Sequence, residues 1–326
     1  MSFDQTPLNL DHLRYEPLAD RPSKVRLADL GRPCAPNVSL DDWIDRLPKQ
    51  LAGNSLRKLV DAIVQAHRSD NQIIAALGGH VIKTGCGPYL IDWIKRGVLS
   101  GLAMNGAAAI HDLELSIAGH TSEDVGPRLI AGEFGFAAET SDLFCQACLH
   151  ARERKIGLGE ALGDVVIEHG GPGLDAGVLA AARKAGIPVT IHVAIGSDIV
   201  HMTPKLDGEA LGAACLTDFR LLCDRVAQLS GGVWLNLGSA VVLPEVFLKA
   251  VSIARNLGRS LDGLTTANLD FQQHYRGLLN VLQRPGAEGI ALTGHHELLL
   301  PLLHAAVVQK IAQRSETQAR LHRAAV

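Results

Sequence analysis

The chain has 326 residues, of which 47% are apolar and 20% charged, and its formal net charge is −3 at pH 7. This composition predicts a soluble globular protein with a large buried core. Lys and Arg are scattered rather than concentrated, and no stretch has the apolar length of a membrane helix. The amino terminus lacks the apolar segment of a signal peptide, so we expect a cytoplasmic protein that binds neither nucleic acid nor membrane.

The six cysteines are too sparse for the disulfide framework of a small secreted protein. Cys145 and Cys148 form a CxxC pair, but they lie in a run with helical spacing, and no second CxxC completes a zinc site. We interpret the pair as part of a helix that packs against the core.

The first 68 residues differ from the rest of the chain. Residues 1 to about 50 are rich in Pro and Asp and have no sustained apolar period, which predicts an arm that lies across the body or a neighbouring subunit. Leu51–His67 has apolar residues at helical spacing and predicts the first firm helix. We expect residues 1–68 to be an arm and helix that pack on the body, and 69–326 to form an α/β domain.

The body begins with a predicted strand, Asn71–Leu77, that ends in Gly78 and Gly79. A second small-residue turn, Thr84-Gly85-Cys86-Gly87, leads into a helix at 88–97. Glycine-rich turns between a strand and a helix let the backbone approach a phosphate, and Lys83 and Thr84 add a charge and a hydroxyl. The spacing matches neither GxGxxG nor a Walker loop, so these turns alone do not define a nucleotide site.

The stretch from residue 98 to 119 is the one around which the chain is organised. Val98–Met104 is an apolar run that suits a buried parallel strand, and Asn105 is a typical helix cap. Gly106 and the alanines at 107–109 leave the first helical turn bare. Bare N–H groups at the carboxyl end of a strand predict an anion site, although an ordinary tight turn has the same composition.

That helix carries His111, Asp112 and Glu114. His111 and Glu114 share one helix face, with Asp112 turned about a quarter-circle away. Three ionisable residues so close to a strand end favour ligand binding or catalysis. Replacing Asp112 or Glu114 by Ala is then expected to abolish binding with little change in stability, whereas residues that anchor a buried network would cost several kcal/mol.

The middle of the chain predicts a long connection, three helices and a strand. Gly119–Thr140 is polar and long enough to carry function, and helices are expected at about 140–155, 158–168 and 174–185. Pro188–Ile195 alternates apolar and polar residues and predicts a strand. Asp198 follows the end of this strand, where folds of this class place ribose or substrate contacts.

Three more predicted strands are each associated with candidate ligand-binding or catalytic residues. They are Gly232–Asn236 followed by Gly238 and Ser239, Leu261–Asn268 ending near Thr265 and Thr266, and Gly289–Thr293 followed by His295, His296 and Glu297. Alternating strands and helices predict a doubly wound α/β fold with a mostly parallel, Rossmann-type sheet. A last apolar helix at 298–313 is expected to be buried or to form a subunit contact.

Taken in order, residues 70 to about 310 resemble the deoxyhypusine synthases, tetrameric enzymes with NAD and spermidine sites between subunits. The matching segments are 83–117, 185–198, 232–258, 265–270 and 297–306. Residues 105–114, NGAAAIHDLE, are also similar to the NAD-binding domain of archaeal-type ornithine cyclodeaminases, which carry an Asn, small residues and a His-Asp-x-Glu there.

The chain departs from the synthases at two places. The synthase catalytic lysine lies in a Trp-Gly-Lys segment, and the corresponding region here, Pro285–Ala291, has no lysine. A histidine pair after the glycine-rich turn is replaced by Pro244 and Glu245. The resemblance therefore implies the scaffold and a nicotinamide site rather than modification of a protein lysine.

What the resemblance implies is an NAD-dependent enzyme that oxidises the amine of an amino acid or polyamine to an imine by hydride transfer. The candidate catalytic residues are His111, Asp112, Glu114, His295 and Glu297. The candidate NAD-binding residues are Gly78, Gly79, Thr84, Gly85, Asn105, Gly106, Asp198, Gly238, Ser239, Thr265 and Thr266. Expected partners are a small amine or amino acid and further copies of the chain in a homo-oligomer, with a tetramer favoured.

Two other functions stay open. Several His and acidic residues follow presumed strand ends, which is compatible with a metal-dependent hydrolase, although no HExxH spacing supports it. The third possibility is a non-catalytic family member that keeps the ligand pocket.

Overall fold

The computed structural model describes residues 7–324, with side chains to residue 313. Its sheet has six strands, all parallel, in the order β3-β2-β1-β4-β5-β6. The strands are β1 (Ile73–Leu77), β2 (Gly101–Asn105), β3 (Val189–His192), β4 (Val233–Leu237), β5 (Thr265–Asp270) and β6 (Glu288–Thr293). The predicted α/β fold with a parallel sheet is confirmed, and its strand order reverses between β1 and β4.

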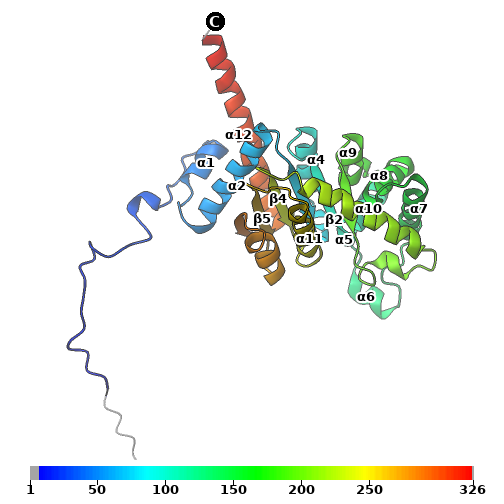
Figure 1. Ribbon diagram of the computed structural model, residues 1–326, viewed down its shortest axis with the longest axis horizontal. Coiled ribbons are helices and arrows are strands. Elements are labelled where there is room, and N and C mark those ends of the chain that lie inside the picture. The colour runs from blue at the N-terminus through cyan, green and yellow to red at the C-terminus, as the bar shows by residue number, and fades with distance from the viewer. Residues whose placement is uncertain (1–6, 325–326) are drawn as a thin grey trace, which may run out of the picture.

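Helices connect the strands (Figure 1). They are α1 (Leu40–Arg46), α2 (Leu51–Arg68), α3 (Gly79–Lys83), α4 (Gly87–Lys95), α5 (Gly106–Ala118), α6 (Val125–Ile130), α7 (Ala138–Arg154), α8 (Leu158–His169), α9 (Val178–Lys184), α10 (Gly208–Val226), α11 (Val242–Asn256) and α12 (His296–Ala324). Short turns of helix are η1 (Leu27–Asp29), η2 (Leu174–Ala176), η3 (Ile199–Met202) and the π-helical η4 (Gly277–Gln283).

The core has two layers because alternate residues of a strand face opposite sides of the sheet. Ile73, Ala75 and Leu77 belong to the larger cluster, with α2, α5 and α12, whereas Ile74 and Ala76 belong to the smaller cluster, with α11. Every residue of β1 is buried, as expected of a central parallel strand. Its uninterrupted apolar sequence follows from that position.

The amino-terminal residues follow a different course from the body. Residues 7–26 are exposed and extend away from the sheet, as Figure 1 shows. The expectation that the arm crosses the body of its own chain is therefore not met, and contact with a neighbouring subunit stays a prediction. Helix α2 contacts β6 and α12.

Several predicted bounds differ from the structure. The sequence places a strand at Leu261–Asn268, whereas β5 runs from Thr265 to Asp270. The short apolar run after Gly79 is a helical turn, α3, and the connection after residue 119 contains α6. Helix α10 begins at Gly208, where the Asp207 carboxylate accepts hydrogen bonds from two backbone N–H groups.

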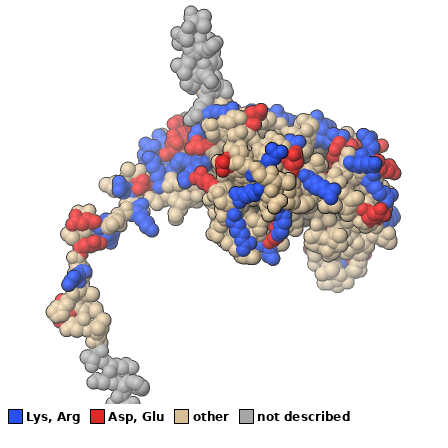
Figure 2. All heavy atoms as spheres, in the orientation of Figure 1, with Lys and Arg blue, Asp and Glu red and all other residues tan. Residues whose placement is uncertain are grey.

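The surface mixes both signs of charge. On the face in Figure 2, Lys and Arg lie among Asp and Glu, and the lobe around α6 is mostly uncharged. Val125, Leu129 and Ile130 are exposed in that lobe. Within residues 7–324, no helix combines the length and apolar character needed to cross a membrane.

Candidate functional site

A cavity of about 880 Å³ lies beside α5, and we call it the α5 cavity. Its walls come from one face of α5, the segment after α5, and the turns that follow β1 and β3. The volume is in the range of small-molecule sites. The lining side chains with ionisable or hydroxyl groups include Lys83, His111, Glu114, Thr121, Thr140 and Asp198.

Local sequence explains where α5 begins and ends. The Asn105 side chain accepts a hydrogen bond from the Ala108 N–H at 2.8 Å, which confirms it as the helix cap. Gly119 ends the helix in the left-handed conformation, with φ 76°. Between these ends, His111 and Glu114 lie on the face of the helix that lines the cavity.

His111 and Glu114 share a hydrogen-bond network with two threonines. Thr121 Oγ1 lies 2.7 Å from His111 Nδ1 and donates to Glu114 Oε2. Thr140 Oγ1 donates to Glu114 Oε1 at 3.0 Å, so both carboxylate oxygens are engaged. Burial lowers the pKa of His111, Lys83 acts in the same direction, and the Glu114 carboxylate opposes them.

Asp112 does not face the cavity. It is 1% exposed, and its two oxygens accept hydrogen bonds from the N–H groups of Val178 and Leu179, each at 2.8 Å. Burial raises the pKa of Asp112 to about 6, against the effect of those two bonds. Its geometry is that of a cap for the first turn of α9, so a single pocket receives His111 and Glu114 but not Asp112.

The amino terminus of α5 is occupied by the chain's own carboxylate. A Cβ on Gly106 would lie 2.2 Å from Asp198 Oδ2, so only glycine leaves room for this side chain. Asp198 accepts a hydrogen bond from the Ala194 N–H at 3.2 Å, and burial raises its pKa. The predicted anion site therefore holds Asp198 itself, whose carboxylate lines the cavity.

Lys83 is the cation of the cavity without an ionic partner among the described residues. It is the last residue of α3, the helical turn that follows β1, and it lines the α5 cavity. Arg128 also lines the cavity, but it forms ion pairs with Glu123 and Glu133. The described cavity thus offers the Lys83 ammonium together with the carboxylates of Asp198, Glu114 and Glu139.

A second group of predicted residues meets where the strand order reverses. A Cβ on Gly78 would lie 2.0 Å from the carbonyl oxygen of Gly238, so the turns after β1 and β4 touch through their backbones. A Cβ on Gly238 would lie 2.6 Å from Nε2 of His296. That nitrogen is buried and has no hydrogen-bond partner within the described part of the chain.

Other predicted site residues have local roles. The Thr84 hydroxyl donates to the His80 carbonyl, and the Ser239 hydroxyl accepts from the Leu243 N–H at the start of α11. Gly85 has φ +77° with open space beside it. These residues sit on turns at the carboxyl edge of the sheet without lining the α5 cavity.

The predicted catalytic residues His295 and Glu297 lie apart from His111. Their side chains are 68% and 48% exposed, and they approach each other to 3.9 Å. The His295 ring stacks on Phe271 with centroids 6.5 Å apart. Neither residue lines the α5 cavity, so the structure does not bring the five predicted catalytic residues together.

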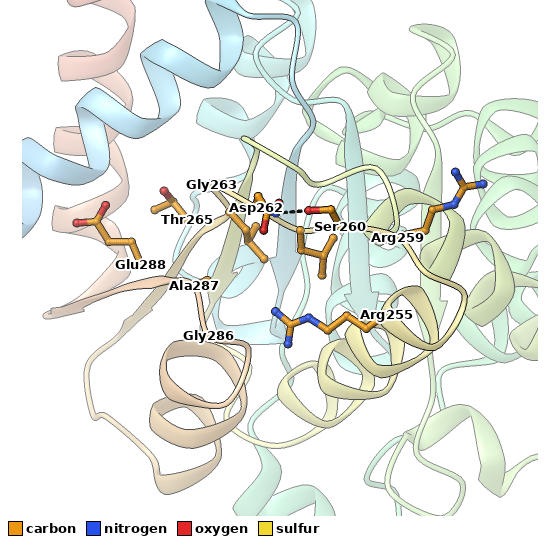
Figure 3. Close-up of a pocket in the computed structure, with 11 residues that line it drawn as sticks. Arg255, Arg259, Ser260, Asp262, Gly263, Thr265, Gly286, Ala287 and Glu288 are labelled. Carbon is orange, nitrogen blue, oxygen red and sulfur yellow. Dashed lines mark hydrogen bonds between the residues drawn. The ribbon is translucent and has the colours of Figure 1, made fainter.

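Thr265 and Thr266 lie at the opposite edge of the sheet from the one predicted for them. Because β5 begins at Thr265, both threonines stand at its amino end, and Asp270 ends the strand. Thr265 lines a different cavity, of about 360 Å³, with Arg255, Ser260 and Glu288 (Figure 3). These two residues therefore cannot contact a ligand at the carboxyl edge.

Thr121 was not singled out by sequence, whereas Lys83 was noted as a charge beside the glycine-rich turn and not as a substrate-binding residue. Thr121 comes ten positions after His111, and only the path of the connection after α5 brings it back. The length of that connection is the signal that could have directed attention to it. Among the described residues, no three His, Cys, Asp or Glu side chains are grouped to hold a metal ion.

The fold is a Rossmann-type α/β fold, and the α5 cavity lies at the carboxyl edge of its parallel sheet, where proteins of this architecture generally bind ligands. No family model and no curated protein sequence matches the chain. Solved structures do match, and they confirm the predicted deoxyhypusine synthase-like α/β fold.

Three solved structures illustrate the match. A deoxyhypusine synthase assigned in Entamoeba histolytica is 10% identical, with a TM-score of 0.52 over 86% of this chain and 96% of that one. AgrE in complex with ornithine and NAD+ is 14% identical, with a TM-score of 0.53 over 82% of this chain and 35% of AgrE. An LOR/SDH protein from Methanococcus maripaludis S2 is 15% identical, with a TM-score of 0.50 over 80% and 71%.

These likenesses concern the fold. This chain spans about a third of the length of AgrE.

Proposed function

We propose that the chain is an NAD-dependent enzyme that oxidises the amine of a small amino acid to an imine. The observation that carries the proposal is that the α5 cavity holds both an ammonium, that of Lys83, and a buried carboxylate, that of Asp198, together with the imidazole of His111. An amino acid presents the complementary carboxylate and ammonium. A polyamine lacks a carboxylate for Lys83, so the charges favour an amino acid.

NAD is the cofactor that this proposal requires, and two observations fit it. The strand order reverses between β1 and β4, and open α/β sheets generally bind ligands at the carboxyl ends of the strands at such a reversal. The buried Nε2 of His296, which has no hydrogen-bond partner among the described residues, lies at that crossover against Gly238. Gly78, Gly238 and His296 would hold the dinucleotide, which supplies the hydride acceptor when bound. AgrE, which has the same type of fold, was crystallised with ornithine and NAD+.

The residues of the α5 cavity have separate roles. Lys83 binds the substrate carboxylate, and Asp198 holds the ammonium group. His111 accepts one proton from the ammonium, which frees the nitrogen lone pair. The adjacent carbon then loses a hydride, and the nitrogen lone pair forms the second C–N bond of a protonated imine. The His111 ring lies against Gly79, with Cδ2 3.2 Å from the position of a Cβ there, so the proton acceptor adjoins the turn after β1.

The test is NAD binding by calorimetry, together with NADH formation from a panel of amino acids and polyamines. Asp198→Asn and Lys83→Met are each expected to raise KM for the amino acid about tenfold or more, the loss of about 1.4 kcal/mol of binding. Lys58→Met is the matched control, because Lys58 pairs with Glu288 on the surface. Absence of NAD binding and of NADH formation with every substrate would refute the proposal.

The other two functions are separated by the same measurements. Binding of NAD and an amino acid without turnover would identify a non-catalytic member of this fold type. A metal-dependent hydrolase would hydrolyse its substrate in the absence of NAD.

A further inference from the structure

The hydrogen-bond network in the α5 cavity contains one group whose role the proposed function does not use. Thr121 lies between the imidazole of His111 and the carboxylate of Glu114 and contacts both. His111 Nδ1 and Glu114 Oε2 are themselves 3.9 Å apart, too far for a direct hydrogen bond. The threonine hydroxyl therefore connects the two side chains.

The direction of each hydrogen bond follows from counting protons. A carboxylate only accepts, and Glu114 accepts at both oxygens, from Thr121 and from Thr140. A threonine hydroxyl has one proton, and the Thr121 proton is used toward Glu114. Its oxygen can then only accept from His111, so Nδ1 of His111 must carry a proton.

We propose that Thr121 fixes the tautomer of His111, with the proton on Nδ1 and the lone pair of Nε2 free to accept a proton in the cavity. Thr121 and Glu114 are positioning residues here, because they act through His111. The tautomer assignment does not depend on the proposed function. Only the role of Nε2 as the acceptor of a substrate proton rests on that function. Which ring nitrogen of a histidine is protonated is generally set by the hydrogen bond that the other nitrogen makes.

The surroundings of His111 agree with this assignment. Nε2 makes no hydrogen bond with any described residue, and the ring lines the α5 cavity. Gly79 leaves room for the ring edge that carries Cδ2. The charged groups that influence its titration are Glu114 on the same helix and Lys83 after β1, and burial keeps the ring neutral to a lower pH than a free histidine.

Nitrogen NMR of protein labelled with 15N-histidine reports the tautomer directly. The signals of His111 are assigned by their loss in His111→Gln. In the wild-type protein at neutral pH we expect a protonated Nδ1 and an unprotonated Nε2. Thr121→Val keeps the side-chain volume between His111 and Glu114 but removes the acceptor, so the Nδ1–H form should change from the major to the minor tautomer.

Two variants serve as controls. Thr140→Val removes the other hydroxyl on Glu114 without touching His111, so the tautomer should stay as in the wild type. Thr121→Ser keeps the hydroxyl and should restore the wild-type spectrum. A wild-type His111 with the proton on Nε2 overturns the inference without any variant, and so does an unchanged tautomer in folded Thr121→Val.

The outcome is independent of the proposed function. A tautomer change in Thr121→Val supports the role of Thr121 in fixing the His111 tautomer even if no substrate is turned over. If the tautomer of His111 changes in Thr121→Val but this variant oxidises amines as fast as the wild type, the proposed role of His111 as proton acceptor fails. The tautomer assignment then still stands.

Discussion

Substituting Gly238 by Ala combines two separate costs at the β1–β4 crossover. Gly238 has φ +67°, a conformation that disfavours a side chain by about 1–2 kcal/mol. The added Cβ would also lie 2.6 Å from Nε2 of His296, a side chain that is 2% exposed and has little space to move. Overpacking of this kind costs about 1–3 kcal/mol.

The sum is about 2–5 kcal/mol, and we take about 3 kcal/mol as the expected loss. At about 2.1 cal/mol/K per residue, unfolding of this chain has an entropy near 0.7 kcal/mol/K, so the melting temperature should fall by about 4 °C. The same displacement of His296 should weaken NAD binding at the crossover.

Gly186→Ala is the matched control for the backbone cost. Gly186 has φ +69°, and a Cβ there would meet nothing within 4 Å. This variant should lose only about 1–2 kcal/mol, or about 2 °C. Scanning calorimetry of both variants gives the difference, and equal losses would refute the contact between Gly238 and His296 as the cause.

Two further predictions concern buried carboxylates. Asp112→Ala should lower the melting temperature, because the N–H groups of Val178 and Leu179 lose their acceptors. Each buried N–H left without an acceptor costs about 1–3 kcal/mol of stability. An unchanged melting temperature together with lost ligand binding would place Asp112 in the site after all. Burial raises the pKa of Asp218 from 3.8 to about 7, so between those values the folded chain holds a proton that the unfolded chain has released. The stability that Asp218 contributes is therefore present below about pH 4 and lost as the pH rises through 7, and urea unfolding should show wild type losing a few kcal/mol relative to Asp218→Asn over that range.

Local patterns were sufficient to predict the elements that form the sheet and the start of α5. The continuous apolar run at 73–77 needs burial on both faces, which a central parallel strand provides. Asn105 caps the helix through a bond to a residue three positions away, so neighbouring residues alone determine that geometry. The spacing of His111 and Glu114 likewise places them on one helix face in any fold.

The partners of the site residues depended on the tertiary structure. Asp112 differs from His111 by one position, yet the approach of α9 rather than any local signal makes it a buried cap. Thr265 and Thr266 lie at the opposite edge of the sheet from the one that the sequence predicted, because pairing with β4 and β6 sets the bounds of β5. Thr121 reaches His111 only because the connection after α5 folds back over the helix. A sequence pattern records which face a residue prefers, whereas the groups that meet it there come from segments far along the chain and are decided by packing.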